Sequence, residues 1–122
     1  MAKIKNLKTL YANGNVEWDI PYLRDRRHGL AKQYYPDGKI KIERPYVNGF
    51  VDGAEKIYDR SGELISFITF RYGAREGLYQ TWHSNGELAV SGNYHNYKLN
   101  GLFRRYDESG RLVFEKNFND NS

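Results

Sequence analysis

The sequence predicts an all-β fold: an elongated, twisted antiparallel meander of about ten strands, built from five 24-residue β-hairpin repeats. Three observations support this. Eleven of the twelve glycines recur at a spacing of 24 residues. Hairpin turn signatures recur at the same spacing, and the segments between them alternate with the two-residue period of strands and show no helical period. A fixed period of this length is typical of tandem arrays in which each unit stacks on its neighbours.

Three glycine series define the repeat. The first is Gly14, Gly38, Gly62, Gly86 and Gly110; the second is Gly29, Gly53, Gly77 and Gly101; the third is Gly49 and Gly73. The corresponding units are 28–51, 52–75, 76–99 and a truncated 100–122, preceded by a degenerate copy at 4–27. Because the units account for nearly the whole chain, we expect a single array over residues 1–122.

The turn within each unit predicts a hairpin. In the segment from Tyr35 to Lys39, Pro36 suits a type I turn and Gly38 suits the left-handed residue that follows it. This combination is typical of a three-residue hairpin loop with a glycine bulge. It predicts that Tyr34 lies opposite Ile40 and Lys32 opposite Ile42. Equivalent turns are Arg60-Ser61-Gly62, Ser84-Asn85-Gly86 and Glu108-Ser109-Gly110.

The strands flanking these turns carry apolar columns that repeat in register. An aromatic column faces an aliphatic one, and a second aromatic column closes each unit. Their members are Leu10, Tyr34, Tyr58, Trp82 and Tyr106; Val16, Ile40, Leu64, Leu88 and Leu112; and Tyr22, Tyr46, Phe70, Tyr94 and Phe118. Aromatics make up 16% of the chain, which suits a single sheet that half-buries its side chains.

Composition excludes several classes of site. The chain has no cysteine, so it has no disulfide framework and no cysteine-based metal site. It has no apolar leader at its start and no apolar run long enough to span a bilayer, which favours a cytoplasmic location. The net charge of +4 fits an acidic protein partner as well as nucleic acid or anionic lipid.

The repeated columns resemble the MORN repeat, in the bacterial variant associated with antitoxin components of toxin–antitoxin systems. The shared pattern is Gly-Leu-x-x-x-Tyr-x-x-x-Gly-x-Leu, followed by Tyr-x-Asn-Gly. It is found at Gly29, Leu30, Tyr34, Gly38, Ile40, Tyr46, Asn48 and Gly49, and it recurs from Gly77 and from Gly101. The first copy is weak, because Lys5 replaces its first glycine. The resemblance implies a curved hairpin array, and a function as a scaffold, a membrane-linked protein or an antitoxin.

No catalytic constellation is present in the sequence. The histidines His28, His83 and His95 occupy three different columns of the repeat, which favours polar turn positions. Carboxylates recur at Asp19, Glu43 and Glu115, where we expect exposed cross-strand charge partners rather than a general acid–base pair. No glycine-rich phosphate loop leads into a helix. The sequence therefore predicts a protein that is not an enzyme and holds no cofactor or metal.

A basic column gives one candidate binding surface. Its position in the strands places it on the same face as the first aromatic column. The combined set is Lys32, Tyr34, Lys56, Tyr58, Trp82, Arg104 and Tyr106. Cations interleaved with aromatics suit a phosphate backbone or stacked bases. The same pattern also arises when lysine stems pack along tyrosine rings with their charged ends in water.

Departures from the repeat give the other candidate surface. The face that is polar in early units becomes apolar at Ile57, Ile65 and Phe67, and Tyr79 and Phe103 extend it. The predicted turn register pairs Ile57 with Ile65. An apolar stretch of this kind indicates either a partner surface or the inside of a bend where the sheet closes on itself.

Together these patterns predict a non-catalytic, intracellular, protein-binding array that acts as an antitoxin or immunity-like factor, with a cognate toxin as one possible partner. Two alternatives remain. One is a module that binds anionic lipid or nucleic acid through the basic–aromatic face, and the other is a structural protein that self-assembles into homo-oligomers.

Overall fold

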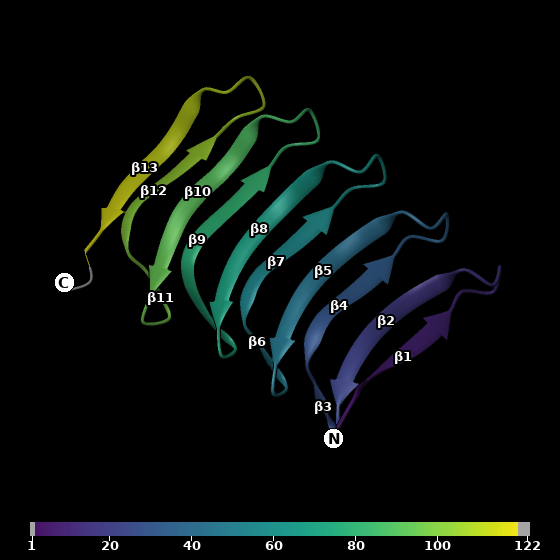
Figure 1. Cartoon of the computed structure of the whole chain (residues 1–122). Helices are drawn as coiled ribbons and strands as arrows, with labels where there is room; N and C mark the ends of the chain where they lie inside the picture. Colours follow the sequence, from purple (N-terminus) through teal and green to yellow (C-terminus); the bar gives the residue numbers. More distant parts are fainter. Residues whose placement is uncertain (1, 120–122) are drawn as a thin grey trace.

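The computed structural model describes residues 2–119, which form one open antiparallel sheet without helices (Figure 1). Ten long strands follow one another in the order of the chain. They are β1 (Ile4–Leu10), β2 (Val16–Leu23), β4 (Gly29–Tyr34), β5 (Ile40–Val47), β7 (Gly53–Tyr58), β8 (Leu64–Arg71), β9 (Ala74–Trp82), β10 (Leu88–His95), β12 (Gly101–Tyr106) and β13 (Leu112–Phe118). Two-residue strands β3 (Arg26–Arg27), β6 (Phe50–Val51) and β11 (Lys98–Leu99) pair with β2, β5 and β10. The predicted all-β meander is confirmed.

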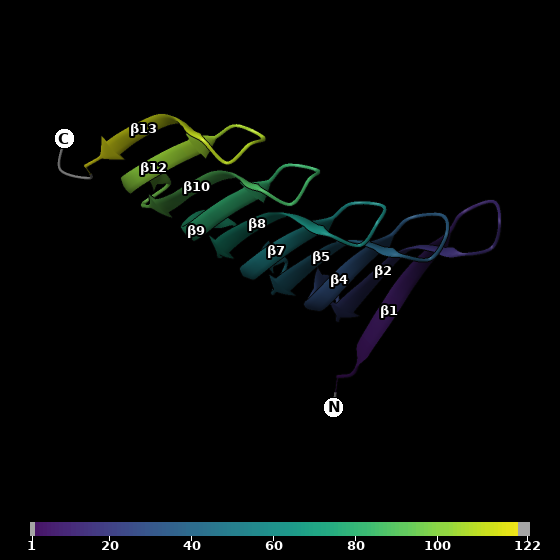
Figure 2. The same cartoon turned by 90° about the horizontal axis from the view of Figure 1, so that it is seen from above.

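The sheet is a single layer, so few residues are buried. Figure 2 shows the strands succeeding one another without a second layer stacked on either face. Among the described residues, Ala31 and Tyr46 are buried apolar side chains at 1% and 7% exposure, and Pro21 of β2 is buried as well. Strand β1 is exposed along its whole length. Burial is therefore deepest in the middle of the array, where each strand has neighbours on both sides.

Three-residue loops join the two long strands of each hairpin, and we call the side of the sheet that they form the loop side. In the second unit the Gly38 N–H donates to the Tyr35 carbonyl at 2.9 Å, and the Tyr35 N–H donates to the Lys39 carbonyl at 2.8 Å. Gly38 has a φ of +94°, in the left-handed region that glycine favours. The predicted turn type is confirmed.

Side chains on the loop side connect consecutive units. The Tyr35 hydroxyl donates to the carbonyl of Tyr58 at 2.6 Å, and the Tyr11 hydroxyl makes the same contact one unit earlier. A ring nitrogen of His83 lies 2.9 Å from the Tyr106 carbonyl oxygen. In the same column, Asp59 instead accepts hydrogen bonds from Ser61 and Glu63 of its own loop.

A β-bulge directly after each loop corrects the predicted register. Tyr34 does pair with Ile40, but Gln33 pairs with Ile42 because Lys41 is left without a partner. Lys32 consequently lies opposite Glu43, so its predicted pairing with Ile42 is wrong. The same shift occurs in every hairpin. The bulged residues are Glu17, Lys41, Ile65, Ala89 and Val113.

The bulge also separates the predicted apolar patch. Ile57 pairs with Ser66, so its predicted pairing with Ile65 is wrong. Phe67 pairs with Lys56 and therefore lies on the face opposite to that of Ile57, because side chains alternate along a strand. The prediction that Ile57 and Phe67 share one face is wrong. The unpaired Ile65 reverses the face that each later residue of β8 occupies relative to β7.

Two-residue turns join consecutive units, and we call the side that they form the turn side. Their first central residues, Arg24, Asn48, Tyr72 and Asn96, have φ values of +56°, +49°, +45° and +51°. The N–H groups of these turns donate hydrogen bonds to side chains at the start of the same unit. The Asn48 N–H donates to a ring nitrogen of His28 at 3.2 Å, and the Tyr72 N–H donates to the Asp52 carboxylate at 3.0 Å.

Candidate functional site

One face of the sheet carries a row of alternating charges, and we call it the ladder face. The row runs across all ten long strands. Its members in order are Lys8, Asp19, Lys32, Glu43, Lys56, Phe67, Gln80, Ser91, Arg104 and Glu115. The expectation that the recurring carboxylates are exposed cross-strand charge partners is confirmed for Glu115, which forms an ion pair with Arg104. Asp19 and Glu43 also lie opposite lysines, but they are half-buried and accept hydrogen bonds from Asn6 and Tyr58.

The first aromatic column lies on this ladder face, one step nearer to the loops. The Tyr58 hydroxyl donates to Glu43 at 2.9 Å. Burial and this hydrogen bond raise the pKa of Tyr58 above its ordinary value. The Arg104 guanidinium lies 3.2 Å from the Glu115 carboxylate. Since each lysine or arginine of the row has a carboxylate beside it, the basic column offers little unbalanced positive charge to a polyanion.

Phe67 is the apolar interruption of this ladder. It is half-buried between Lys56 and Gln80 in the row, at a position where three of the other four units place a carboxylate and one places Ser91. The sequence correctly singled out Phe67 as a departure but assigned it to the wrong face. Ile57, Tyr79 and Phe103 share the other face of the sheet. Ile65 is the bulged residue of its hairpin and has no partner on β7.

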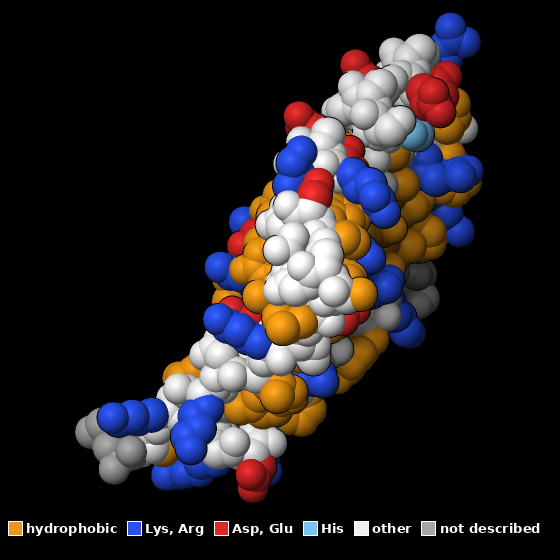
Figure 3. Space-filling model, turned by 90° about the vertical axis from the view of Figure 1, so that its right-hand side faces the viewer, with side chains coloured by type: hydrophobic (Ala, Val, Ile, Leu, Met, Phe, Trp, Pro, Cys, Tyr) orange, Lys and Arg blue, Asp and Glu red, His pale blue; other side chains and the backbone are white. Residues whose placement is uncertain are grey.

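The second face combines aromatics with cations, and we call it the aromatic face. Its rings form edge and tilted contacts towards the C-terminal end of the array. The ring centroids are 5.9 Å apart for Tyr79 and Tyr94, 6.0 Å for Phe103 and Phe114, and 6.1 Å for Phe103 and Phe118. Figure 3, which looks at the array from the loop side, shows hydrophobic side chains in patches that Lys and Arg side chains interrupt.

Arginine and lysine side chains cover several of these rings. The distances from the charged group to the ring centroid range from 4.8 to 5.5 Å, within the reach of cation–π attraction. The pairs are Arg27 on Tyr46, Arg75 on Tyr94, Arg105 on Phe114 and Lys116 on Phe118. Sequence reasoning missed these cations, because only the bulged register places them beside the second aromatic column.

Positive charge on the aromatic face exceeds negative charge. Among the described residues paired across this face, Glu55 is the one carboxylate, and it is buried against Arg44. Burial alone would lower the pKa of Arg44, but the hydrogen bonds to Glu55 and Tyr46 outweigh it and raise this pKa. With Glu55 occupied in this way, Arg27, Arg75 and Arg105 leave the face suited to an acidic partner.

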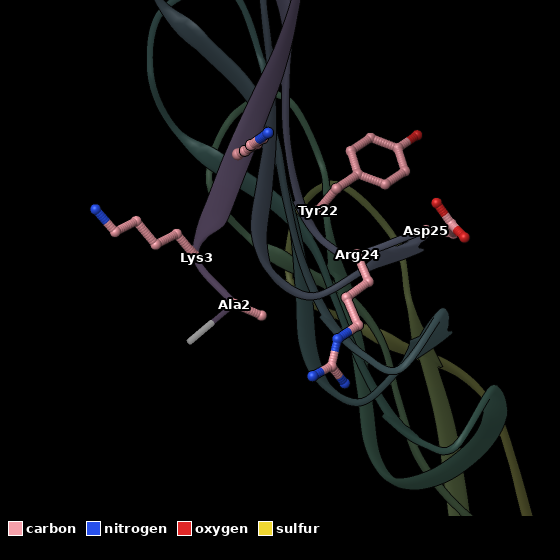
Figure 4. A pocket seen from close by; sticks show the side chains of 6 residues that line it. Ala2, Lys3, Tyr22, Arg24 and Asp25 are labelled. Atoms are coloured by element: carbon pink, nitrogen blue, oxygen red, sulfur yellow. The ribbon is translucent and has the colours of Figure 1, made fainter.

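One surface hollow gathers charged side chains near the start of the array. It lies where β1 meets the first two-residue turn and is lined by Lys3, Lys5, Tyr22, Arg24 and Asp25, with Ala2 at its margin (Figure 4). Figure 4 shows the Lys3 side chain pointing away from Tyr22 and Asp25. Within residues 2–119 no group of His, Asp and Glu side chains has the arrangement of a metal site. The described residues also include no helix of the length and hydrophobicity that a bilayer requires.

Comparison with known proteins identifies the family of the repeat. The MORN repeat variant family matches residues 27–48, 75–96 and 99–120, which together make up more than half of the chain. No curated protein matches the sequence. A chain in the "Crystal structure of GtfA/B complex bound to UDP and GlcNAc" aligns with a TM-score of 0.36 and 11% identity, over 97% of this chain and 24% of that chain. A similarity at this level is too low to transfer a function.

Proposed function

This chain belongs to the MORN repeat variant family, and from that premise we propose that it binds a protein partner through the aromatic face of its sheet. MORN repeats are generally non-enzymatic modules that bind proteins or membranes. A finer part of the proposal is that the protein acts inside the cell as an antitoxin or immunity-like factor. Its support is the resemblance of the repeat pattern to antitoxin-associated bacterial variants.

One observation carries the choice of surface: the aromatic face has exposed cations that no carboxylate on the same face balances. Tyr, Trp and Arg are the residues that most often dominate protein interfaces. On the ladder face, by contrast, cations and carboxylates alternate. A partner that approaches the ladder face would meet cations and carboxylates in alternation, with the Arg104–Glu115 ion pair already formed. One that approaches Arg75 and Arg105 would meet cations that pack on rings instead.

The test is a pair of charge variants. Tagged protein is isolated from its native host and its partner is identified by mass spectrometry. The double variant Arg75→Glu/Arg105→Glu should lose that partner, because it reverses the charge at two exposed cations of the aromatic face. The ladder-face triple variant Lys32→Gln/Lys56→Gln/Arg104→Gln should keep it. The opposite pattern, with both proteins folded by circular dichroism, would reassign the site to the ladder face.

The variant Phe67→Asp tests the ladder face independently. A carboxylate at this position would lie beside Lys56 and extend the alternation of charges found in other units. We therefore expect a folded protein that keeps its partner. Loss of the partner together with an unchanged melting temperature would show that Phe67 itself is part of the interface.

Binding of lipid or nucleic acid is the competing function, and salt separates it from the proposal. Retention on anionic vesicles or on nucleic acid should fall steeply as ionic strength rises. The antitoxin role has its own test: co-expression of this chain with a toxin partner should restore growth, and Arg75→Glu/Arg105→Glu should abolish the rescue.

A further inference from the structure

We infer that the turn side of the sheet carries a second contact surface, formed by Phe50, Tyr72 and Tyr97, that receives an acidic segment of the partner protein. This inference rests on the proposed function, because it concerns the same protein partner. It adds the chemistry of that partner and a contact outside both faces of the sheet.

The backbone is strained at two of the turns. Tyr72 and Tyr97 have φ values of +45° and +69°, in the left-handed region that residues other than Gly, Asn and Asp rarely adopt. The same chain shows what these turns use otherwise. Asn48 and Gly49 form the equivalent turn one unit earlier, with residue types that adopt this region readily. At two positions the chain therefore replaces a favourable turn residue with an unfavourable tyrosine.

The three aromatic side chains on the turn side are exposed to solvent. Tyr72 is 61% exposed, Tyr97 78% and Phe50 51%, so these rings add little to the core. Phe50 and Tyr72 lie against each other at the tips of adjacent turns, with ring centroids 6.2 Å apart in an edge-to-face arrangement. Large exposed aromatics that neither pack in the core nor relax the backbone are explained by contact with another molecule.

Acceptors at the junction of the second and third units hold the strained turn of Tyr72 in place. The Tyr72 N–H donates to the Asp52 carboxylate at 3.0 Å, and the Gly73 N–H donates to the Val51 carbonyl at 2.8 Å. The turn is therefore fixed before a partner arrives. A presented aromatic in a rigid turn loses less entropy on binding than one on a flexible loop.

Charge on the turn side selects the chemistry of the partner. Arg71 and Lys98 are exposed and directly adjacent in sequence to Tyr72 and Tyr97. The nearby carboxylates already act as acceptors: Asp52 for the Tyr72 N–H, and Glu76 for His95 and the Asn96 N–H. A shallow hollow of about 280 Å³ separates the two tyrosine turns, lined by Arg71, Glu76, His95 and Tyr97 together with Ala74 and Asn96. Carboxylates of a partner would meet the cations here while its apolar groups meet the rings.

The experiment uses the purified chain as bait for a random peptide display library, followed by affinity measurements on the selected peptides. We expect these peptides to be rich in Asp and Glu. The variant Tyr72→Asn/Tyr97→Gly, which copies the turn at Asn48 and Gly49, should weaken their binding at least tenfold. It should melt at the same or a higher temperature, because it removes strain. A melting temperature lower by more than about 5 °C would show that the tyrosines serve folding and would overturn the inference.

Controls separate this inference from the proposed function. If the tyrosine variant keeps both the peptides and the host partner while Arg75→Glu/Arg105→Glu loses the partner, the turn-side inference is wrong and the proposed function stands. If tyrosine-dependent peptide binding is found but the host yields no protein partner, the proposed function fails instead. Selection of no acidic peptide, with binding to vesicles of phosphatidylserine and phosphatidylcholine that the variant abolishes, would assign the tyrosines to a membrane and overturn the inference.

Discussion

The loop side and the turn side of the sheet differ in how regularly the same residue type recurs at their left-handed positions. On the loop side every unit places a glycine in the left-handed region, with φ between +89° and +94° at Gly14, Gly38, Gly62, Gly86 and Gly110. On the turn side the corresponding left-handed residue is an arginine, an asparagine, a tyrosine and again an asparagine. Both sides close hairpins of the same sheet. The need to close a hairpin therefore explains the first pattern but not the second.

This difference separates residues that the fold requires from residues that it does not require. Where each unit uses the same residue for the same φ, the residue is explained by folding alone. Where a unit accepts strain and exposes an aromatic ring, folding offers no explanation and contact with a partner does.

The largest effect is expected on the loop side. Replacing Gly38 with Val should lower the free energy of unfolding by about 1–3 kcal/mol, because a β-branched residue resists the left-handed region. A Cβ at Gly38 meets no other atom within 4 Å, so the effect should come from the backbone rather than from a clash. Urea denaturation measures it. If Gly38→Val and the parallel Gly86→Val unfold like the parent protein, the loop side is not the structural side that the comparison requires.

A smaller loss is expected when strain is added to the turn side. The change Gly49→Tyr copies into the second unit the arrangement of Asn96 and Tyr97. It should cost about 1–2 kcal/mol, the usual penalty of the left-handed region for an L-residue. Because Tyr is not β-branched, the loss should be smaller than that of Gly38→Val. A fully neutral change in urea denaturation would mean that this turn tolerates any residue, and the argument from Tyr72 and Tyr97 would lose its basis.

The fold was largely predictable from the sequence, and the sites were less so. The glycine period and the turn residues around Gly38 predict the hairpin array directly. The bulge at Lys41 has no such signature: it adds one unpaired residue to a strand whose alternation looks regular. The equivalent bulge at Ile65 decides which face Phe67 occupies. The bulges at Lys41 and Ala89 place the rings of Tyr46 and Tyr94 on the face where they meet Arg27 and Arg75. Strain at Tyr72 is equally hidden, because φ becomes known only once the turn geometry is known.

The links between units on the loop side should have a moderate effect. Tyr35→Phe removes the hydroxyl that donates to the Tyr58 carbonyl. The expected loss is about 1 kcal/mol, as for a single hydrogen bond. Tyr97→Phe is the matched control, since it removes an exposed hydroxyl on the turn side and should leave thermal stability unchanged. Equal effects of the two changes would contradict the division between the sides.

The smallest effect concerns acid. Hydrogen bonds from Ser61 and from the Glu63 backbone lower the pKa of Asp59, and Ser109 and Arg111 do the same for Asp107. A lowered pKa means that the fold favours the charged form. The contribution is therefore present at neutral pH and is lost as the pH falls below the ordinary range of about 4. Melting curves from pH 7 to pH 2 should lose slightly less stability in Asp59→Asn/Asp107→Asn than in the parent. A steeper loss in the variant would contradict the assignment.

The single layer of the sheet has a mechanical consequence. Hydrogen bonds between antiparallel strands run perpendicular to the strands, and here that direction is the long axis of the array. Tension applied between β1 and β13 would therefore pull along these bonds and load them a few at a time, rather than shear a whole strand at once. Because each unit contacts only its neighbours, hairpins should peel away one after another at low force. Under load the protein would lengthen in steps of one hairpin. Each released hairpin would re-form its hydrogen bonds without disturbing the other units.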